Sequence, residues 1–359
     1  PSESDIITLR QPLFKLRSFF ALSQARAQVR GVAAEIEREK QAVAFRFTSA
    51  YFEVLLSLER IDLIRTQIKN IETQLKAAER AFSLGAGTST DVSEFKSQLH
   101  RLRAQEVGLK ETLRIPLEQL QSITGEKVVN INKLDPRRLS PERFDPGELT
   151  ALLELILLKS PDILARAAQI EAAKIGVKVA RAEHLPTLDA VVQYSSSVSD
   201  NPFFTSSQIQ TTSAGLQLTI PIFSGGSMQS RVRESASRLE ESRERHQLAI
   251  NDARIQILKE YATVKQAIAE ASAYESVVAS VEQNLAAAKR GYLLGTQTIQ
   301  SVLSAEYRKS QALLEQSNAR YSLINAWVRM SALIGLIDDE EFSRLNELLS
   351  DSKTLIIQD

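Results

Sequence analysis

The feature that most constrains the fold is an internal repeat. The segment AERAFSLGAGTSTDVS at 78–93 returns as AKRGYLLGTQTIQSVL at 288–303, an offset of 210 residues. A shorter pair, PLF at 12–14 and PIF at 221–223, keeps an offset of 209. Because self-similarity at a fixed offset marks one structural unit used twice, two tandem halves are predicted. With the offset of 210 and no gaps, the residues that face identical partners are Ala77, Ala78, Arg80, Leu84, Gly85, Thr88, Val92, Leu113 and Gly125.

Each half contains a long row of apolar residues that lie alternately three and four positions apart. The rows run from Val43 to Phe82 and from Ile250 to Tyr292. Their mean spacing of about 3.5 residues is that of a coiled-coil seam with a left-handed supercoil. No proline interrupts residues 22–83, so a helix there would extend about 90 Å. These rows predict a mainly α protein rather than a compact globule.

A glycine follows each long helix and predicts a tight turn. Gly85 and Gly295 are suited to the position after the last helical turn, because glycine adopts the left-handed conformation at little cost. Thr88 and Thr298 then offer hydroxyl caps for a second helix of about 35 residues that returns along the first. Each half is therefore predicted to contain an antiparallel helical hairpin. The simpler alternative is that the repeated phrase is only a favourable turn.

Two segments alternate between apolar and polar residues and predict β-strands. They are residues 187–197 and 211–223, and each shows a period of two with one apolar side. Residues 4–14 look like the corresponding second strand of the first half. Runs of about 11 residues are long enough to cross a bilayer as tilted strands. The sequence has no run of about 18 apolar residues, so membrane contact is expected through strands. An ordinary soluble hairpin is the alternative.

The composition excludes several classes of function. Lys plus Arg equals Asp plus Glu at 44 each, and no basic stretch is interleaved with aromatic residues, so nucleic-acid binding is not expected. The absence of cysteine excludes disulfides, thiolate metal sites and cysteine nucleophiles. His100, His184 and His246 are isolated and lack metal-ligand spacing. We therefore expect no enzymatic activity, no cofactor and no metal site.

Several motifs in combination resemble the outer-membrane efflux protein (TolC) family. They are EHLPTLD at 183–189, IPIFSGG at 220–226, GYLLGTQTIQSVLSAE at 291–306 and NARYSLINAWVRMSALIG at 318–335. The resemblance implies a homotrimer in the outer membrane of a Gram-negative bacterium. Four strands per chain would form a 12-stranded transmembrane β-barrel in lipid, and the helices would form a coiled-coil helical barrel through the periplasm.

The resemblance also implies expected segments. Glu126–Gly147 breaks both periodicities and is expected to join the halves and, with the tail from Asp338, to form an equatorial girdle; a disordered linker and tail is the alternative. Helix and strand preceding Pro1, about 60–70 residues with a signal peptide, are expected to be missing from the first half. The segments are 1–14 (strand of the first half), 15–125 (hairpin), 126–149 (connection), 150–186 (first helix of the second half), 187–223 (strand pair), 224–337 (second hairpin) and 338–359 (C-terminal equatorial segment).

The hairpin tips are the expected periplasmic gate. By the resemblance, acidic gate positions fall on Ser301 and Ser304, and an arginine position falls on Gln297, so this chain departs from the family's acidic ring there. Tyr292 and Asp91 match the family's tyrosine and its aspartate partner on the first hairpin. Glu94 is a candidate substitute source of negative charge, but a solvated helix face is the preferred explanation for it. The tip residues expected to contact a partner are Leu84, Gly85, Leu294, Gly295 and Thr298.

The function implied is a passive export duct. Its partners would be a periplasmic adaptor (membrane fusion) protein and an inner-membrane ABC transporter or proton-driven pump. Type I protein secretion is the preferred system, and drug or metal efflux is the alternative. A periplasmic coiled-coil adaptor or structural protein is an alternative of another class, but an adaptor is expected to show one hairpin between split β segments rather than two hairpins.

Overall fold

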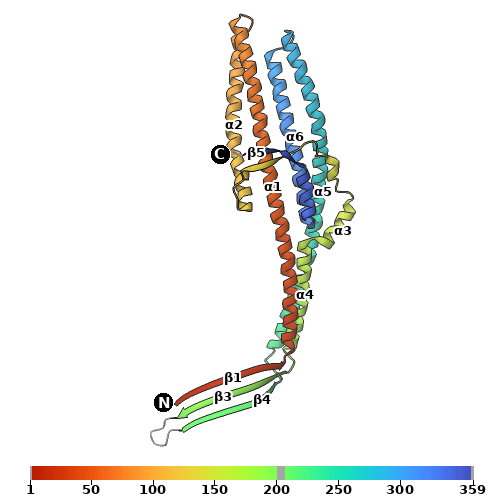
Figure 1. Ribbon diagram of the computed structural model, residues 1–359. Helices are drawn as coiled ribbons and strands as arrows, with labels where there is room; N and C mark the ends of the chain where they lie inside the picture. The colour runs from red at the N-terminus through yellow and green to blue at the C-terminus, as the bar shows by residue number, and fades with distance from the viewer. Residues whose placement is uncertain (1, 200–206, 357–359) are drawn as a thin grey trace. The chain divides into compact units, whose positions relative to one another are not determined.

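The computed structural model describes residues 2–199 and 207–356. It is mostly helical, as the long apolar rows predict. In chain order (Figure 1) the elements are β1 (Ser2–Phe14), α1 (Leu16–Ser83), α2 (Ser89–Thr124), β2 (Asn130–Leu134), η1 (Pro141–Phe144), α3 (Leu149–Lys159), α4 (Pro161–Ala182), β3 (Thr187–Ser199), β4 (Ser207–Thr219), α5 (Ser227–Leu293), α6 (Ile299–Ile334), α7 (Asp339–Glu347) and β5 (Leu349–Ile356).

The chain divides into two compact units. Unit 1 comprises residues 1–36 and 161–252, and unit 2 comprises residues 37–160 and 253–359. The long helices α1 and α5 contribute to both units, and each unit draws on both tandem halves. The candidate site at the hairpin tips lies within unit 2.

Unit 1 contains an antiparallel sheet in the order β1-β3-β4. Its register places Leu9 opposite Val192 and Val192 opposite Ala214. Because side chains alternate between the faces of a sheet, this register brings the apolar sides of all three strands onto one face. The opposite face carries mainly polar side chains, including Thr8, Arg10, Gln193, Ser213 and Gln217. The Arg10 guanidinium donates a hydrogen bond to Oε1 of Gln217 at 3.0 Å on this polar face.

The last strand of the sheet differs in extent from the predicted segment 211–223. β4 begins earlier, at Ser207, and ends at Thr219. Pro221 has no backbone N–H to donate to a neighbouring strand. The chain then bends through Gly225 (φ 60°) and Gly226 (φ 80°) before α5 begins. The strand therefore ends where hydrogen bonding of the ladder can no longer continue.

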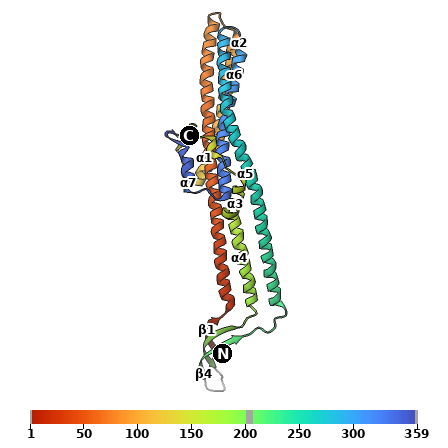
Figure 2. The same cartoon turned by 90° about the vertical axis from the view of Figure 1, so that its right-hand side faces the viewer.

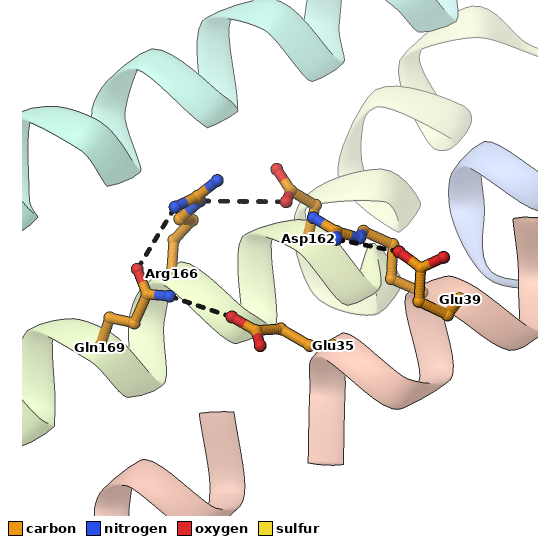
Figure 3. Close-up of polar contacts among 6 residues, drawn as sticks. Glu35, Glu39, Asp162, Arg166 and Gln169 are labelled. Atoms are coloured by element: carbon orange, nitrogen blue, oxygen red, sulfur yellow. Dashed lines mark hydrogen bonds and ion pairs between the residues drawn. The ribbon is translucent and has the colours of Figure 1, made fainter. Parts of the chain in front are cut away.

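The helices of unit 1 combine a close contact with a chain of polar contacts. At Gly31 of α1, a Cβ atom would lie 3.6 Å from Cβ of Ala168 in α4, so the two helices approach closely there. Gln169 of α4 donates a hydrogen bond to Oε1 of Glu35 in α1 at 3.2 Å, and Arg166 donates to Oε1 of Gln169 at 3.4 Å (Figure 3). These polar contacts link α4 to α1 beside the close approach at Gly31.

The segment expected as one helix over 150–186 is two helices. α3 ends at Lys159, Ser160 has ψ of 120°, and α4 begins at Pro161. The residue before a proline is driven out of the helical region, and proline is well suited to the first helical position. The break is therefore a direct consequence of the Ser160-Pro161 sequence.

Unit 2 contains the two helical hairpins, α2 with its part of α1 and α6 with its part of α5. Figures 1 and 2 show them side by side with their turns at the same end. Buried residues from all four helices share one core near the turns. This tip core consists of Ile64, Ile71, Ala78, Phe95, Leu99, Leu102, Leu285, Ala288, Ile299, Val302 and Ala305. It holds the two tips together as one body.

A second core in unit 2 lies around the small β2-β5 sheet. The Tyr51 hydroxyl donates to the carbonyl of Asn132 at 3.1 Å, and Lys133 pairs with Asp62 of α1 at 2.7 Å. The buried Gln41 amide both donates to and accepts from the backbone of Ile337, at 2.9 and 3.0 Å. The connection, for which disorder was the alternative, thus supplies a strand that is tied to α1, and the tail supplies the strand that pairs with it.

Candidate functional site

The two tip turns have the same backbone geometry. Gly85 has φ of 74° and Gly295 has φ of 72°. The amide of Ala86 bonds the carbonyl of Ala81 at 2.9 Å, and the amide of Thr296 bonds the carbonyl of Gly291 at 2.9 Å. This six-residue closure around a left-handed glycine is the Schellman motif. The helix ends predicted at both glycines are confirmed.

Threonine hydroxyls begin both returning helices. Thr88 Oγ1 accepts from the amide of Asp91 at 3.1 Å, and Thr298 Oγ1 accepts from the amide of Ser301 at 3.4 Å. α2 and α6 each contain 36 residues. Both hairpins therefore enter and leave the tip through equivalent caps, as the repeat predicts.

One pair of facing positions is occupied differently in the two tips. In the first, Ala81 faces Gly87; at the equivalent positions of the second, Gly291 faces Gln297. A Cβ atom on Gly87 would lie 2.9 Å from the amide nitrogen of Phe82, and one on Gly291 would lie 2.7 Å from Cγ of Gln297. Each turn thus keeps a glycine on one side of a contact too close for two side chains.

Large apolar side chains are exposed at both tips. The exposed fraction is 82% for Leu84, 83% for Leu293 and 78% for Leu294. Phe82 is also more than half exposed. A cluster of this kind is unfavourable in water and is typical of a surface that contacts another protein. Contact with a partner through Leu84 and Leu294 remains a prediction.

The structure brings Asp91 of the first hairpin into the electrostatic environment of Tyr292 on the second. Burial, and secondarily the negative charge of Asp91, raise the pKa of Tyr292 above its ordinary value. Glu94 lies one turn after Asp91 on α2 and makes no ion pair with any residue that the structure describes. Asp91 thus lies within electrostatic range of Tyr292, and the role of the two residues as a latch stays a prediction.

The three residues that differ from the family pattern line the same groove. Its wall contains Gln297, Ser301 and Ser304 together with other residues of α5 and α6. The volume of the groove is about 480 Å³. The groove also contains polar residues that the sequence reasoning did not select, namely Asn284, Gln300 and Arg308. Ala287 and Ala288 form its apolar part. Helical spacing of three and four residues from Ser301 and Ser304 would have indicated Arg308.

Polar side chains also connect the two hairpins, and the sequence alone did not predict these contacts. Gln74 of α1 donates to Oε1 of Glu306 in α6 at 2.6 Å, and Lys289 of α5 bonds the same oxygen at 2.8 Å. The Glu306 side chain is only 15% exposed. A second link joins Gln67 of α1 to Ser310 of α6. These residues lie on polar positions beside the seams, where spacing alone gives no sign of a partner.

In the ranges 2–199 and 207–356, no group of three or more His, Asp or Glu side chains is arranged to hold a metal ion. Over the same residues, no helix is long and apolar enough to cross a membrane. The tips combine exposed leucines with a polar groove beside them.

The fold defines a class of duplicated hairpin proteins. It combines two tandem helical hairpins that have matching tips with a sheet of long strands that has one apolar and one polar face. The chain belongs to the outer membrane efflux protein family, whose model matches residues 2–126 and 152–336. This confirms the resemblance carried by the motifs.

Individual relatives agree with this assignment. The chain is 27% identical over 337 residues to the alkaline protease secretion protein AprF of Pseudomonas aeruginosa, covering 93% of this chain and 70% of AprF. It is 26% identical to the outer membrane protein TolC of Vibrio cholerae, covering 98% of this chain and 82% of TolC. A solved structure of CusC superposes with a TM-score of 0.78 at 18% identity, covering 93% of this chain and 77% of the other. These likenesses confirm the fold.

Proposed function

We propose that this chain is the subunit of a trimeric outer-membrane channel that gives exported molecules a passive path across the periplasm and the outer membrane. Membership of the outer membrane efflux protein family supports a transport role and favours a channel over the adaptor alternative. The periplasmic position of the helices and the membrane position of the strands belong to the same proposal.

The observation that carries the proposal is the register of the sheet in unit 1. It aligns Leu9, Val192 and Ala214 on one face and polar residues on the other. Leu216 and Leu218 on the apolar face are 69% and 60% exposed. A sheet with one apolar face and one polar face is suited to the wall of a transmembrane barrel, with lipid on one side and water on the other. The edges at β1 and β4 would be paired by strands of neighbouring copies.

Type I protein secretion is the export system that we infer, with an inner-membrane ABC transporter and a periplasmic adaptor as partners. Two of the relatives are named for protein secretion, AprF and the proteases secretion protein PrtF of Dickeya chrysanthemi, which is 23% identical over 342 residues. The exposed leucines at the tips are the surface that we assign to the adaptor.

Efflux of small molecules is the second candidate. The chain is also 24% identical over 336 residues to the outer membrane efflux protein BepC of Brucella suis. An inner-membrane proton-driven pump would then replace the ABC transporter, and the same tips would serve the adaptor.

Deletion of the gene in its own bacterium separates the two candidates. If secretion is correct, one or more proteins disappear from the culture medium and accumulate inside the cells, and a plasmid copy of the gene restores them. An unchanged set of extracellular proteins, together with greater sensitivity to toxic small molecules, would replace secretion by efflux. A deletion strain that shows neither change would contradict both candidates.

A further inference from the structure

We propose that the groove between α5 and α6 at the second tip binds a single oxyanion, either a carboxylate or an inorganic oxyanion, through the Arg308 guanidinium. The residues facing the bound group would be Ser301, Ser304 and Arg308 from α6, and Asn284 from α5. Binding at this groove does not depend on the export function proposed above.

The first argument is that Arg308 has no partner in the part of the chain that the structure describes. Neither a hydrogen bond nor an ion pair joins it to any of residues 2–199 or 207–356. Two carboxylates of the second hairpin are already paired with lysines, Glu306 with Lys289 at 2.8 Å and Glu282 with Lys309 at 2.9 Å. The guanidinium of this exposed residue is therefore unpaired within the described chain, and its planar fork suits the two oxygens of a carboxylate or sulfate.

The second argument is the chemistry of the groove wall. Every polar residue that lines the groove is an amide, a hydroxyl or the guanidinium, and no carboxylate lines it. Hydroxyls and amide NH₂ groups can donate to an anion, whereas a carboxylate would repel it. Between residues 283 and 308 the sequence has three cationic side chains, Lys289, Arg290 and Arg308, against the single carboxylate of Glu306.

The third argument is the shape of the groove. Ser301, Ser304 and Arg308 are spaced by three and four residues, which places them on one face of α6. Ala287 and Ala288 stand on the facing side of α5, and their small side chains leave the space open. A volume of about 480 Å³ is sufficient for a small oxyanion with some of its water.

The first hairpin provides an internal comparison. An offset of 210 residues relates Ser301 to Asp91, Ser304 to Glu94 and Arg308 to Gln98. The two acids of the first hairpin are thus replaced by hydroxyls in the second, and a neutral amide is replaced by a cation. The equivalent surfaces of the two hairpins have opposite electrostatic character, so only the second is suited to an anion.

The test uses the purified full-length protein and the reactivity of its arginines. Phenylglyoxal modifies free guanidinium groups, and mass spectrometry measures the rate at each arginine separately. Sodium sulfate and sodium acetate are added in separate titrations, with sodium chloride at matched ionic strength in the reference samples, because salt alone screens charge. Arg290, which lies outside the groove, reports non-specific effects.

We expect saturable protection of Arg308 in the millimolar range, as a single charge-assisted contact site implies, with no equal protection of Arg290. Protection by acetate but not by sulfate would identify a carboxylate site. Protection by both anions would identify a site that also binds inorganic oxyanions. If Arg308 reacts at the same rate with and without both anions, or if Arg290 is protected equally, the proposal is wrong.

Two variants give matched controls. The double variant Ser301→Asp, Ser304→Glu installs the acids of the first hairpin and is expected to abolish the protection of Arg308 by added anions. The variant Gln98→Arg places an arginine at the equivalent position beside Asp91 and Glu94, and that arginine is expected to show no protection. Full protection of Arg308 in the double variant, or of the introduced arginine in the second variant, would contradict the assigned role of the groove wall.

Discussion

Gly291 and Gln297 approach each other so closely in the second tip that a Cβ atom on the glycine would lie 2.7 Å from Cγ of the glutamine. The equivalent pair in the first tip, Ala81 and Gly87, has the glycine on the other side. A turn that admits one side chain but not two can conserve its geometry with either arrangement. The tandem halves therefore share a backbone while differing in sequence at the same contact.

This contact predicts a specific rescue. Gly291→Ala should destabilise the second tip by about 1–3 kcal/mol, because the added methyl group overpacks the turn. Gln297→Gly in the same chain should restore it, since it recreates the arrangement of the first tip. Hydrogen exchange of the peptide containing Thr296 measures the local stability. Exchange that is fast in Gly291→Ala and equally fast in the double variant would contradict the explanation. Gly87→Ala should be more harmful, because its Cβ would meet the backbone nitrogen of Phe82 at 2.9 Å.

The link through Glu306 predicts coupling between the hairpins. Glu306→Gln removes the charge that Gln74 and Lys289 share, and we expect the tips to separate over a wider range of distances, with a loss of about 1–2 kcal/mol. The chain has no cysteine, so spin labels on Leu84→Cys and Leu294→Cys report the tip-to-tip distance without background. Glu282→Gln, which breaks a pair within the second hairpin only, is the control. Equal tip-to-tip distance distributions in the Glu306→Gln variant, the Glu282→Gln variant and the protein with neither substitution would refute the coupling.

Tyr51 predicts a loss of stability at high pH. Burial raises the pKa of Tyr51 from its ordinary value near 10 to about 12. Below pH 10 the tyrosine is neutral in the folded and unfolded states and its contribution is fully present. Between pH 10 and 12 only the unfolded state ionises, so stability falls as pH rises. The fall in Tm between pH 10 and 12 should be smaller in Tyr51→Phe than in the unchanged protein; an identical fall would contradict the assignment.

The two faces of the sheet predict opposite responses to charge. Leu216→Arg places a cation on the apolar face, and in contact with lipid it should cost about 2–4 kcal/mol and reduce the folded protein recovered from outer-membrane fractions. Ser213→Arg places the same side chain on the polar face of the same strand and should be tolerated. Equal recovery of both variants would show that the apolar face does not meet lipid.

Local capping chemistry explains why the tips could be predicted from sequence. Gly85, Gly295, Thr88 and Thr298 act through the backbone within a few residues, so their types and spacing are sufficient. The pairing of β2 with β5 could not be predicted, because it joins a strand of five residues to the far end of the chain. The break between α3 and α4 at Ser160 could be predicted from the proline that follows it. The helical pattern on both sides of Ser160 favoured one continuous helix instead.

The groove and the contacts of Glu306, in contrast to the tip turns, could not be predicted from the sequence. Both depend on which face of α6 meets α5 and α1, and the apolar spacing fixes the seam but not the partners of the polar residues beside it. The departures at Gln297, Ser301 and Ser304 could be located from the sequence. Their meeting with Arg308 in one groove required the packed hairpins.

The most direct test of the central claim is a cryo-electron microscopy reconstruction of the protein extracted from outer membranes. We predict three copies around one axis, with the helical hairpins enclosing an aqueous bore, the apolar sheet faces in contact with lipid or detergent, and both tips at the end away from the membrane. A solid bundle with no bore, or a single copy whose strands are surrounded by water, would contradict the account.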